Sequence, residues 1–534
     1  MFFKIFKAFG RTEKLFFLGF AAVFLASGGL LIWFSVEKNV SRIPVSGGEY
    51  REGAIGQPIY VNPVLANENG VDQDLIALVY ANLFDLSKNR ELEADQRSYL
   101  ISLRDDILWS DGERITSDDV IFTLKLIQDS SAHSPLFQTW QGVVAERISE
   151  LQIRFVLPDP YVFFEKNLSR LVVVPKHIFG SIPPANLRLS VYNLEPVGSG
   201  PYKFSGYDKQ RDGFITDYRL ETSKNYFGKK PFIVGFAFKF YQDEAGLVEA
   251  FNSRAIDGFG GIDPEKLNSL SLNKKVFEMI MPRYYAVFFN QSVSETLKEK
   301  DTRMALMEAV DKKKIINEVF GGSAIESNGP LLAGFEGYDA DSETAVDYAP
   351  EKARERTASL AAKKLSLELS LVVPHVPFLV KTANLLKQYW EEAGFKINLL
   401  ILSPTDVAGE VIRTRNYEML LFGASIANNP DIFSFWHSSE RFYPGLNFSL
   451  YNNRKTDELL ELARQTSDTA KQLDYLKDIQ KLISSELPAL FLYSPKYLYV
   501  SAPMLDGVET DGLNFPSERF NKVEEWFEKT AKVL

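Results

Sequence analysis

The chain has 534 residues, with 60 Lys and Arg, 70 Asp and Glu, four His and no Cys. The lack of Cys excludes disulfides, thiolate metal sites, cysteine catalysis and a thioether-linked lipid. The net charge of −10 argues against nucleic-acid binding, which relies on clustered positive charge. With 45% hydrophobic residues the chain can bury large cores, so we expect several folded domains.

The N-terminal segment is the most apolar part of the chain. Residues 15–36 contain no charged side chain, and as a helix they would span about 33 Å, enough to cross a bilayer core of roughly 30 Å. Four basic residues against one acidic residue place 1–14 in the cytoplasm, with the rest of the chain outside. The alternative is a secretory signal cleaved near 26–28. Because the apolar run continues to Phe34, we favour an uncleaved membrane anchor.

Beyond Val45, short apolar runs alternate with amphipathic helical patterns, which indicates mixed α/β structure. The predicted strands are 171–175, 232–240, 284–289, 367–373, 417–423 and 489–495. The predicted helices lie within 301–322 (two stretches), 380–394, 455–465 and 471–487, and a further one opens at Thr116.

Two short motifs have a predicted local geometry. Asp111-Gly112 predicts a tight turn that leads to Thr116, whose side chain can cap the next helix by accepting a hydrogen bond from the Asp119 amide. In the sequence VGSGPYKF, Gly198 and Gly200 are expected to allow positive φ before a strand that starts near Tyr202.

Enzymatic motifs do not occur in the sequence. It contains no G-x-S-x-G elbow, phosphate loop, G-x-G-x-x-G or H-E-x-x-H pattern. The four His, at 133, 177, 375 and 437, are not paired in sequence, so a His-rich metal site is not expected. The carboxylates are too numerous to single out a catalytic pair, so an enzyme has no positive support in the sequence; no cofactor is expected and a hydrolase is ranked last.

A series of motifs in a fixed order carries a family resemblance. The chain reads IYVNPVL from Ile59, SLRDDILWSDGERITSDDVIFTLKLIQD over 102–129, VGSGPYKFSGYD over 197–208 and NNPDIFSFWHS over 428–438. From about Gly53 to Val500 the chain resembles the extracytoplasmic substrate-binding proteins of ABC importers, in the class that serves dipeptides, oligopeptides and nickel chelates.

The resemblance implies an α/β fold of the two-lobed periplasmic-binding-protein type (cluster C), with an inserted domain, added to the N-terminal transmembrane helix. Ligand would bind in the cleft between the lobes, and the closed form would dock on membrane permease subunits. The expected domains are lobe I from 45–83, 196–285 and 495–534, the inserted domain from 84–195, and lobe II from 286–494.

The resemblance also suggests ligand contacts in two loops. One contains Asn67, Glu68 and Asn69, for which a solvated turn is the alternative. The other is 423–438, where peptide-binding relatives carry an Asp that pairs with the ligand's α-amino group.

In this chain Ile426 occupies the position of that Asp, and Ala424 replaces a Trp found in some relatives. Because an apolar side chain cannot offset a buried ammonium, either Asn428, Asn429 or Asp431 is expected to act as the polar anchor, or the ligand is not held by its N-terminus.

Tyr284 and Tyr285 are candidate cleft aromatics, with core packing as the alternative. The expected solute is a di- or oligopeptide, and the expected state is a monomer tethered to the membrane. Other interpretations are a receptor for a nickel chelate or an oligosaccharide, and a tethered relative with a signalling or chaperone-like role.

Overall fold

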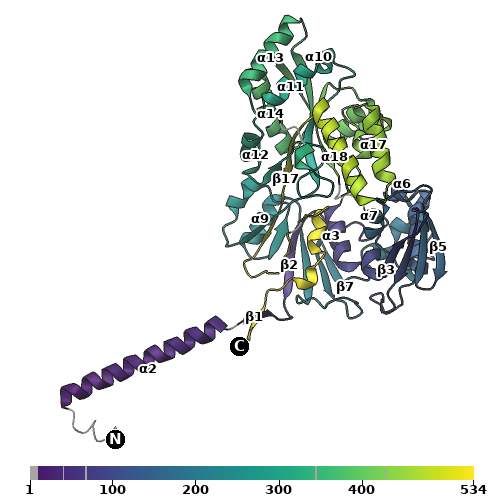
Figure 1. Ribbon diagram of the computed structural model, residues 1–534. Helices are drawn as coiled ribbons and strands as arrows, with labels where there is room; N and C mark the ends of the chain where they lie inside the picture. The colour runs from purple at the N-terminus through teal and green to yellow at the C-terminus, as the bar shows by residue number, and fades with distance from the viewer. Residues whose placement is uncertain are drawn as a thin grey trace.

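The computed structural model describes residues 10–39, 41–66, 69–342, 346–426, 429–510 and 512–533. Figure 1 shows two stacked bodies of sheets and helices, with a long helix that projects away from the lower one. That helix, α2 (Arg11–Asn39), covers the predicted apolar segment, and over 11–30 it is apolar and long enough to cross a membrane by length and composition.

The lower body contains two sheets. We call the seven-stranded sheet, with the order β11-β18-β10-β2-β9-β8-β7, the first sheet. The four-stranded sheet, with the order β3-β4-β6-β5, is called the third sheet. Their strands are β11 (Lys275–Met279), β18 (Tyr497–Ser501), β10 (Gly258–Gly260), β2 (Glu49–Ile55), β9 (Gly235–Tyr241), β8 (Ile215–Thr222), β7 (Tyr202–Lys209), β3 (Ser87–Leu92), β4 (Ser98–Leu103), β6 (Gln152–Val156) and β5 (Val144–Ser149). Buried side chains of both sheets belong to one apolar core, so the segment with the third sheet packs as an extension of the first.

The upper body is built on the second sheet, with the order β13-β17-β12-β16-β14-β15. These strands are β13 (Ala324–Glu326), β17 (Ala489–Pro495), β12 (Arg283–Phe289), β16 (Met419–Ser425), β14 (Glu368–Pro374) and β15 (Lys396–Leu402). Apolar clusters cover both faces of this sheet, and every residue of β17 is buried.

Helices cover the sheets of both bodies (Figure 1). The longer ones are α3 (Gly70–Val79), α5 (Ser117–Gln128), α9 (Glu244–Asn252), α11 (Lys300–Glu308), α12 (Lys312–Phe320), α13 (Pro350–Ala362), α14 (Pro377–Glu392), α17 (Arg454–Gln465) and α18 (Thr469–Glu486). Short turns include α4 (Leu83–Leu86), α6 (Phe137–Trp140), α7 (Phe164–Ser169), α8 (Lys176–Phe179), α10 (Glu295–Lys298), α15 (Pro404–Asp406), α16 (Phe433–Trp436), η4 (Pro264–Ser269) and η8 (Pro516–Phe520).

Two chain crossings, each between consecutive strands, join the two bodies. In the first sheet β11 pairs antiparallel with β18, and in the second sheet β12 pairs antiparallel with β17. Only residues 280–282 separate β11 from β12, and only Lys496 separates β17 from β18. β12 therefore lies in the second sheet from Arg283 onward, slightly before the lobe boundary at 285 that we expected. Two short crossings side by side are the geometry of a hinge.

The two predicted local motifs have different outcomes. Thr116 and Asp119 form a reciprocal capping box at the start of α5, as expected. Gly198 and Gly200 do not have positive φ, so that prediction is wrong. A Cβ atom would lie 2.0 Å from the Val79 carbonyl oxygen at Gly198 and 2.7 Å from the Leu78 carbonyl oxygen at Gly200, so glycine is needed for close backbone approach.

The strand that follows α2 pairs with the last strand of the structure. β1 (Ser41–Pro44), which begins directly after α2, pairs antiparallel with β19 (Thr530–Val533). The backbone of Val45 extends this pairing by donating to the Lys529 carbonyl at 3.0 Å. Both termini therefore leave the lower body at one place (Figure 1).

Candidate functional site

A polar bridge connects the two bodies apart from the hinge strands. The Tyr161 hydroxyl of the lower body lies 2.7 Å from Asp431 Oδ2 of the upper body, and Arg464 Nε donates to the same oxygen at 3.1 Å. The Val162 amide also donates to the Arg464 carbonyl at 3.0 Å. The Asp431 side chain is only 9% exposed, so these contacts replace its solvent. Burial raises the pKa of Tyr161, which keeps its hydroxyl protonated and able to donate.

Two ion pairs also cross between the bodies. Lys166 Nζ lies 3.1 Å from Glu336 Oε2, and Lys381 Nζ lies 2.6 Å from Glu265 Oε1. These side chains are between 39% and 56% exposed, so each pair contributes little to stability by itself. Together with the polar bridge they show that the two bodies are held against each other at several places.

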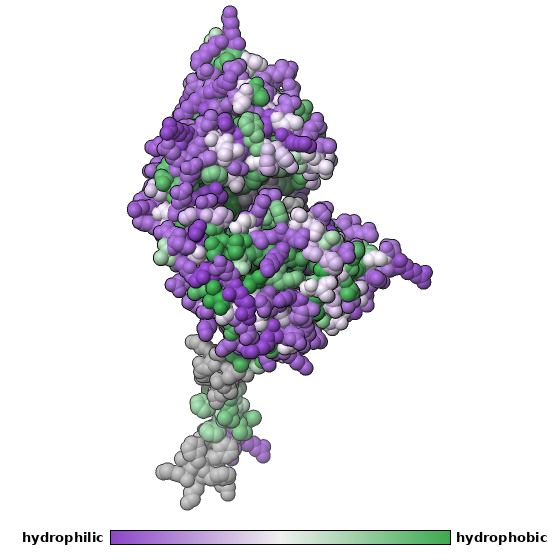
Figure 2. All heavy atoms as spheres, turned by 90° about the vertical axis from the view of Figure 1, so that its right-hand side faces the viewer, coloured by the Kyte–Doolittle hydropathy of each residue, from purple (hydrophilic) through white to green (hydrophobic). Residues whose placement is uncertain are grey.

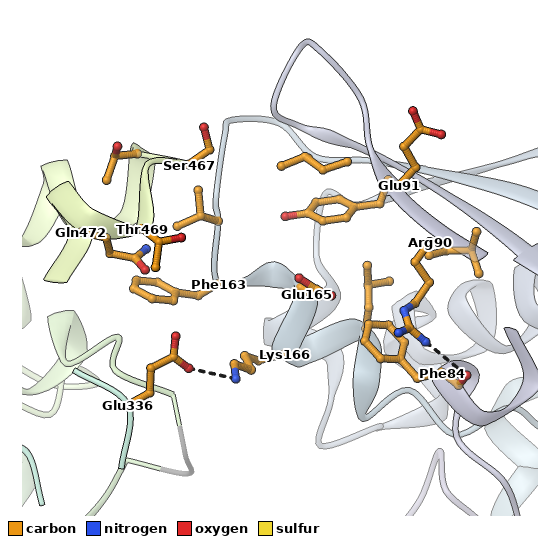
Figure 3. Close-up of a pocket in the computed structure, with 16 residues that line it drawn as sticks. Phe84, Arg90, Glu91, Phe163, Glu165, Lys166, Glu336, Ser467, Thr469 and Gln472 are labelled. Atoms are coloured by element: carbon orange, nitrogen blue, oxygen red, sulfur yellow. Dashed lines mark hydrogen bonds and ion pairs between the residues drawn. The ribbon is translucent and has the colours of Figure 1, made fainter. Parts of the chain in front are cut away.

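The surface is hollowed between the two bodies, and Figure 2 shows apolar residues gathered along this hollow. One pocket at this junction has a volume of about 360 Å³. Figure 3 shows side chains entering it from both bodies: Phe163 and Glu165 from the lower body, and Ser467, Thr469 and Gln472 from the loop before α18 and its first turn. Because both bodies supply its walls, the pocket exists only while they are in contact.

The pocket combines apolar and charged groups. Arg90 lies over the ring of Phe84, with its guanidinium carbon 4.1 Å from the ring centroid. Glu91 and Glu165 add negative charge to the same lining, and the Lys166–Glu336 pair lies at one side (Figure 3). Such a lining can accept an amphiphilic solute with charges of both signs.

The first predicted loop falls partly within the described residues. Asn67 and Glu68 lie outside them. Asn69 is the N-cap of α3: its Oδ1 accepts from the Val71 amide at 3.0 Å and its Nδ2 donates to the Gln57 carbonyl at 3.1 Å. Its side chain therefore has a structural role in this state.

The second predicted loop contains the bridge. Asn428 lies outside the described residues, while Asn429 Oδ1 accepts from the Asp431 amide at 3.1 Å. Asp431 is therefore engaged by Tyr161, by Arg464 and, through Oδ1, by the Phe433 amide. Ile426 and Ala424 are both buried and belong to the apolar cluster on one face of the second sheet.

The two tyrosines on β12 face opposite sides of the second sheet. Tyr284 is fully buried and packs edge-on against Phe491, with ring centroids 5.2 Å apart, so it fills the core. Tyr285 is only partly buried and contacts Phe378 at the start of α14, with centroids 5.0 Å apart. Tyr284 and Tyr285 therefore pack against the apolar clusters on opposite faces of the second sheet.

Sequence reasoning did not identify Tyr161 and Arg464 as site residues. Tyr161 follows a loop that contains two prolines, and Arg464 is near the end of an ordinary amphipathic helix. Neither position carries a local pattern that distinguishes it from other surface residues. Across the described part of the chain, no group of three or more His, Asp or Glu side chains is arranged to hold a metal ion.

Comparisons with known proteins agree with this architecture. The pattern of the bacterial extracellular solute-binding proteins, family 5, matches residues 62–442. The oligopeptide-binding protein AppA of Bacillus subtilis is 23% identical, with 95% of this chain and 96% of AppA aligned.

Solved structures show the same fold. The ABC transporter substrate-binding protein CtaP of Listeria monocytogenes has a TM-score of 0.80 at 24% identity, covering 90% of this chain and 99% of CtaP. NikZ of Campylobacter jejuni, solved in complex with Ni(L-His), has a TM-score of 0.69 at 23% identity, covering 90% of this chain and 99% of NikZ.

Proposed function

Because this chain belongs to the family 5 bacterial extracellular solute-binding proteins, which are binding proteins and not enzymes, we propose that it captures peptides between its two bodies and delivers them to an ABC permease. The observation that carries this proposal is the hinge formed by the β11–β18 and β12–β17 strand pairs, together with the bridge apart from these strands. A hinge and separable polar contacts apart from it allow the bodies to open for a solute and close over it.

The nearly full-length alignment with an oligopeptide-binding protein favours peptides as the solute. Extended peptides can be held through backbone hydrogen bonds, which tolerate varied side chains. The amphiphilic pocket at the junction of the bodies suits such a ligand. NikZ shows that the same fold also binds a nickel complex, so recovery of a metal complex from the purified protein would count against peptides.

The surroundings of Asp431 favour a peptide that is not anchored by its amino group. Ile426 offers no charge, and the carboxylate of Asp431 already pairs with Arg464. A ligand ammonium would have to displace a cation that is held in place by Tyr161 and Asp431. We therefore propose recognition of the peptide away from its N-terminus.

Titration calorimetry with alanine peptides, from dialanine to nonaalanine, tests both statements. We expect binding by at least part of this series, and we expect N-acetylation to weaken it by less than about threefold, equivalent to below 1 kcal/mol. If no peptide binds, the peptide proposal fails. If acetylation weakens binding by about a hundredfold, the amino group is an anchor after all.

We also propose that α2 remains as a membrane anchor, that the bodies lie outside the cell and that the protein acts as a monomer. The apolar stretch over 11–30 and the preceding basic residues support this arrangement. We expect the protein to sediment with membranes, to be released by detergent but not by alkaline carbonate, and to retain its N-terminal residues. A mature chain that begins near residue 28 would identify a cleaved signal instead.

A further inference from the structure

Arg283 lies where the chain crosses from the lower body to the upper body. It is the first residue of β12, directly after the 280–282 crossing, and it pairs with Ser425 at the end of β16. β14, β15 and β16 run parallel to one another, so their carboxyl ends share the edge of the second sheet at which Arg283 lies. In α/β proteins, the edge formed by the carboxyl ends of parallel strands is where ligands usually bind.

The guanidinium of Arg283 has no partner in the described part of the chain. Its side chain makes no hydrogen bond or ion pair there, and its Nε atom is buried without an acceptor. Burial lowers the pKa of Arg283, and the titratable groups that interact with it are the hydroxyls of Tyr285 and Tyr497, with no carboxylate among them. The positive charge is therefore not compensated by the protein groups described.

Other deeply placed arginines each donate to acceptors of the chain, although Arg415 Nη1 and Arg519 Nε, like Arg283 Nε, are buried without an acceptor among the described residues. Arg303 donates to four backbone carbonyls, and Arg415 donates to the carbonyls of Arg441 and Gly445. Arg519 pairs with Glu52 and Asp74. Arg283 differs from these arginines because its guanidinium makes no hydrogen bond to any described residue, which leaves it free to bind an acceptor that a ligand supplies.

The surroundings of Arg283 suit an anion. Tyr285, on the same face of β12, contacts Phe378 in the first turn of α14, a helix of 16 residues. No side chain caps the start of α14, so its first amides and the positive end of its dipole add to the potential created by Arg283. Arg283 also keeps partial exposure, which leaves its charge accessible to a solute.

We propose that Arg283 binds a carboxylate of the captured solute, either the C-terminal carboxylate of a peptide or an acidic side chain. This inference rests on the proposed function of the same cleft. Because Asp431 is already engaged by protein groups, the inference places the charged group that anchors the ligand at the hinge. This group is a cation, not an anion.

The variant Arg283→Met tests the proposal through two readouts. In ligand-free protein we expect Tm to rise by about 2 °C or more, because an apolar side chain of similar length removes an unpaired buried charge. Affinity for pentaalanine should fall by about 10- to 100-fold, as expected for the loss of a charge-assisted hydrogen bond to a carboxylate. A residue with a purely structural role would lower Tm when removed.

Arg454→Met is the matched control, since it also removes one positive charge but from a side chain that is 93% exposed. We expect it to change neither Tm nor affinity measurably, and Arg283→Lys should retain most of the binding. Three ligands separate the sources of the carboxylate: pentaalanine, its C-terminal amide, and an amidated peptide that carries one Asp. Binding of the amide as tight as that of the free acid, with affinity unaffected by Arg283→Met, would overturn the inference while leaving the peptide proposal intact.

Native mass spectrometry of protein purified from its own cells covers the case in which alanine peptides do not bind. We expect the retained cargo to contain a carboxylate and to be depleted in Arg283→Met but not in Arg454→Met. A cargo without any anionic group would overturn the inference, whatever its class.

Discussion

Replacing Arg519 by Met is expected to destabilise the protein by about 3–5 kcal/mol, the cost of leaving buried charges without their partner. Arg519 is almost fully buried and donates to Glu52 Oε1 at 2.8 Å and to both oxygens of Asp74 at 2.8 and 2.6 Å. The Tyr499 hydroxyl donates to the other oxygen of Glu52 at 2.8 Å. The network joins η8, near the C-terminus, to β2 and α3.

The stability lost in Arg519→Met should increase with pH. Burial raises the pKa of both Glu52 and Asp74, and the nearby Arg519 opposes that shift. Without Arg519 the folded state binds protons on these carboxyls more tightly than the unfolded chain does, so its stability falls as pH rises. We therefore expect the deficit of Arg519→Met to be largest above pH 7 and to shrink under acidic conditions.

Urea unfolding at several pH values measures this effect. Arg354→Met is the matched control, because Arg354 pairs with Glu351 on an exposed helix surface and should contribute no more than about 1 kcal/mol. Equal free energies of unfolding for the Arg519 and Arg354 variants would contradict a large contribution of the buried network to stability.

Replacing Asp431 by Asn is expected to shift the ligand-free protein toward an open arrangement and to weaken solute binding by about 10- to 100-fold. The change removes the charge that holds Arg464 and receives the Tyr161 hydroxyl, and hydrogen bonds to charged groups contribute about 1.5–3 kcal/mol each. Because the Tyr161 contact forms only when the bodies meet, its loss penalises the closed state alone.

Small-angle X-ray scattering of the free protein measures this shift as an increase in the radius of gyration. Asp339→Asn is a matched control, since Asp339 pairs with Lys477 within the upper body at 3.3 Å and does not cross the junction. Tyr161→Phe should act in the same direction as Asp431→Asn, and the double variant should be less than additive because the two residues share one contact. An unchanged radius in both single variants would exclude the bridge as a closing contact.

Much of the fold could be predicted from local patterns. The strand predicted at 489–495 has those bounds in the structure, and the helices predicted at 455–465 and 471–487 differ from α17 and α18 by two residues or fewer at each end. Caps and periodicity fix these elements locally. The predicted strand at 171–175 fails, because only Val172 forms an isolated bridge, with Asn82. Its apolar side chains are buried in a core without a strand partner.

The site was less predictable because its contacts are long-range. Tyr161 and Asp431 are 270 positions apart in the sequence, and nothing near either residue specifies the other. The resemblance pointed to the loop around Asp431 as a ligand contact, which stays a prediction, and it did not identify Arg464 as the cation that pairs with this carboxylate. Arg283 was missed for a related reason: an arginine at the start of an apolar strand is unremarkable until one knows that no described residue accepts from its guanidinium.

The β1–β19 pairing limits the distance between α2 and the lower body. Four paired residues span about 13 Å. With α2 in a bilayer, this two-stranded pairing would hold the lower body close to the lipid surface. Without β19, the eight residues from 41 to 48 would become a flexible linker with a maximum length of roughly 26–29 Å. β19 therefore acts as a brace between α2 and the lower body, and deleting it would let the lower body move further from α2.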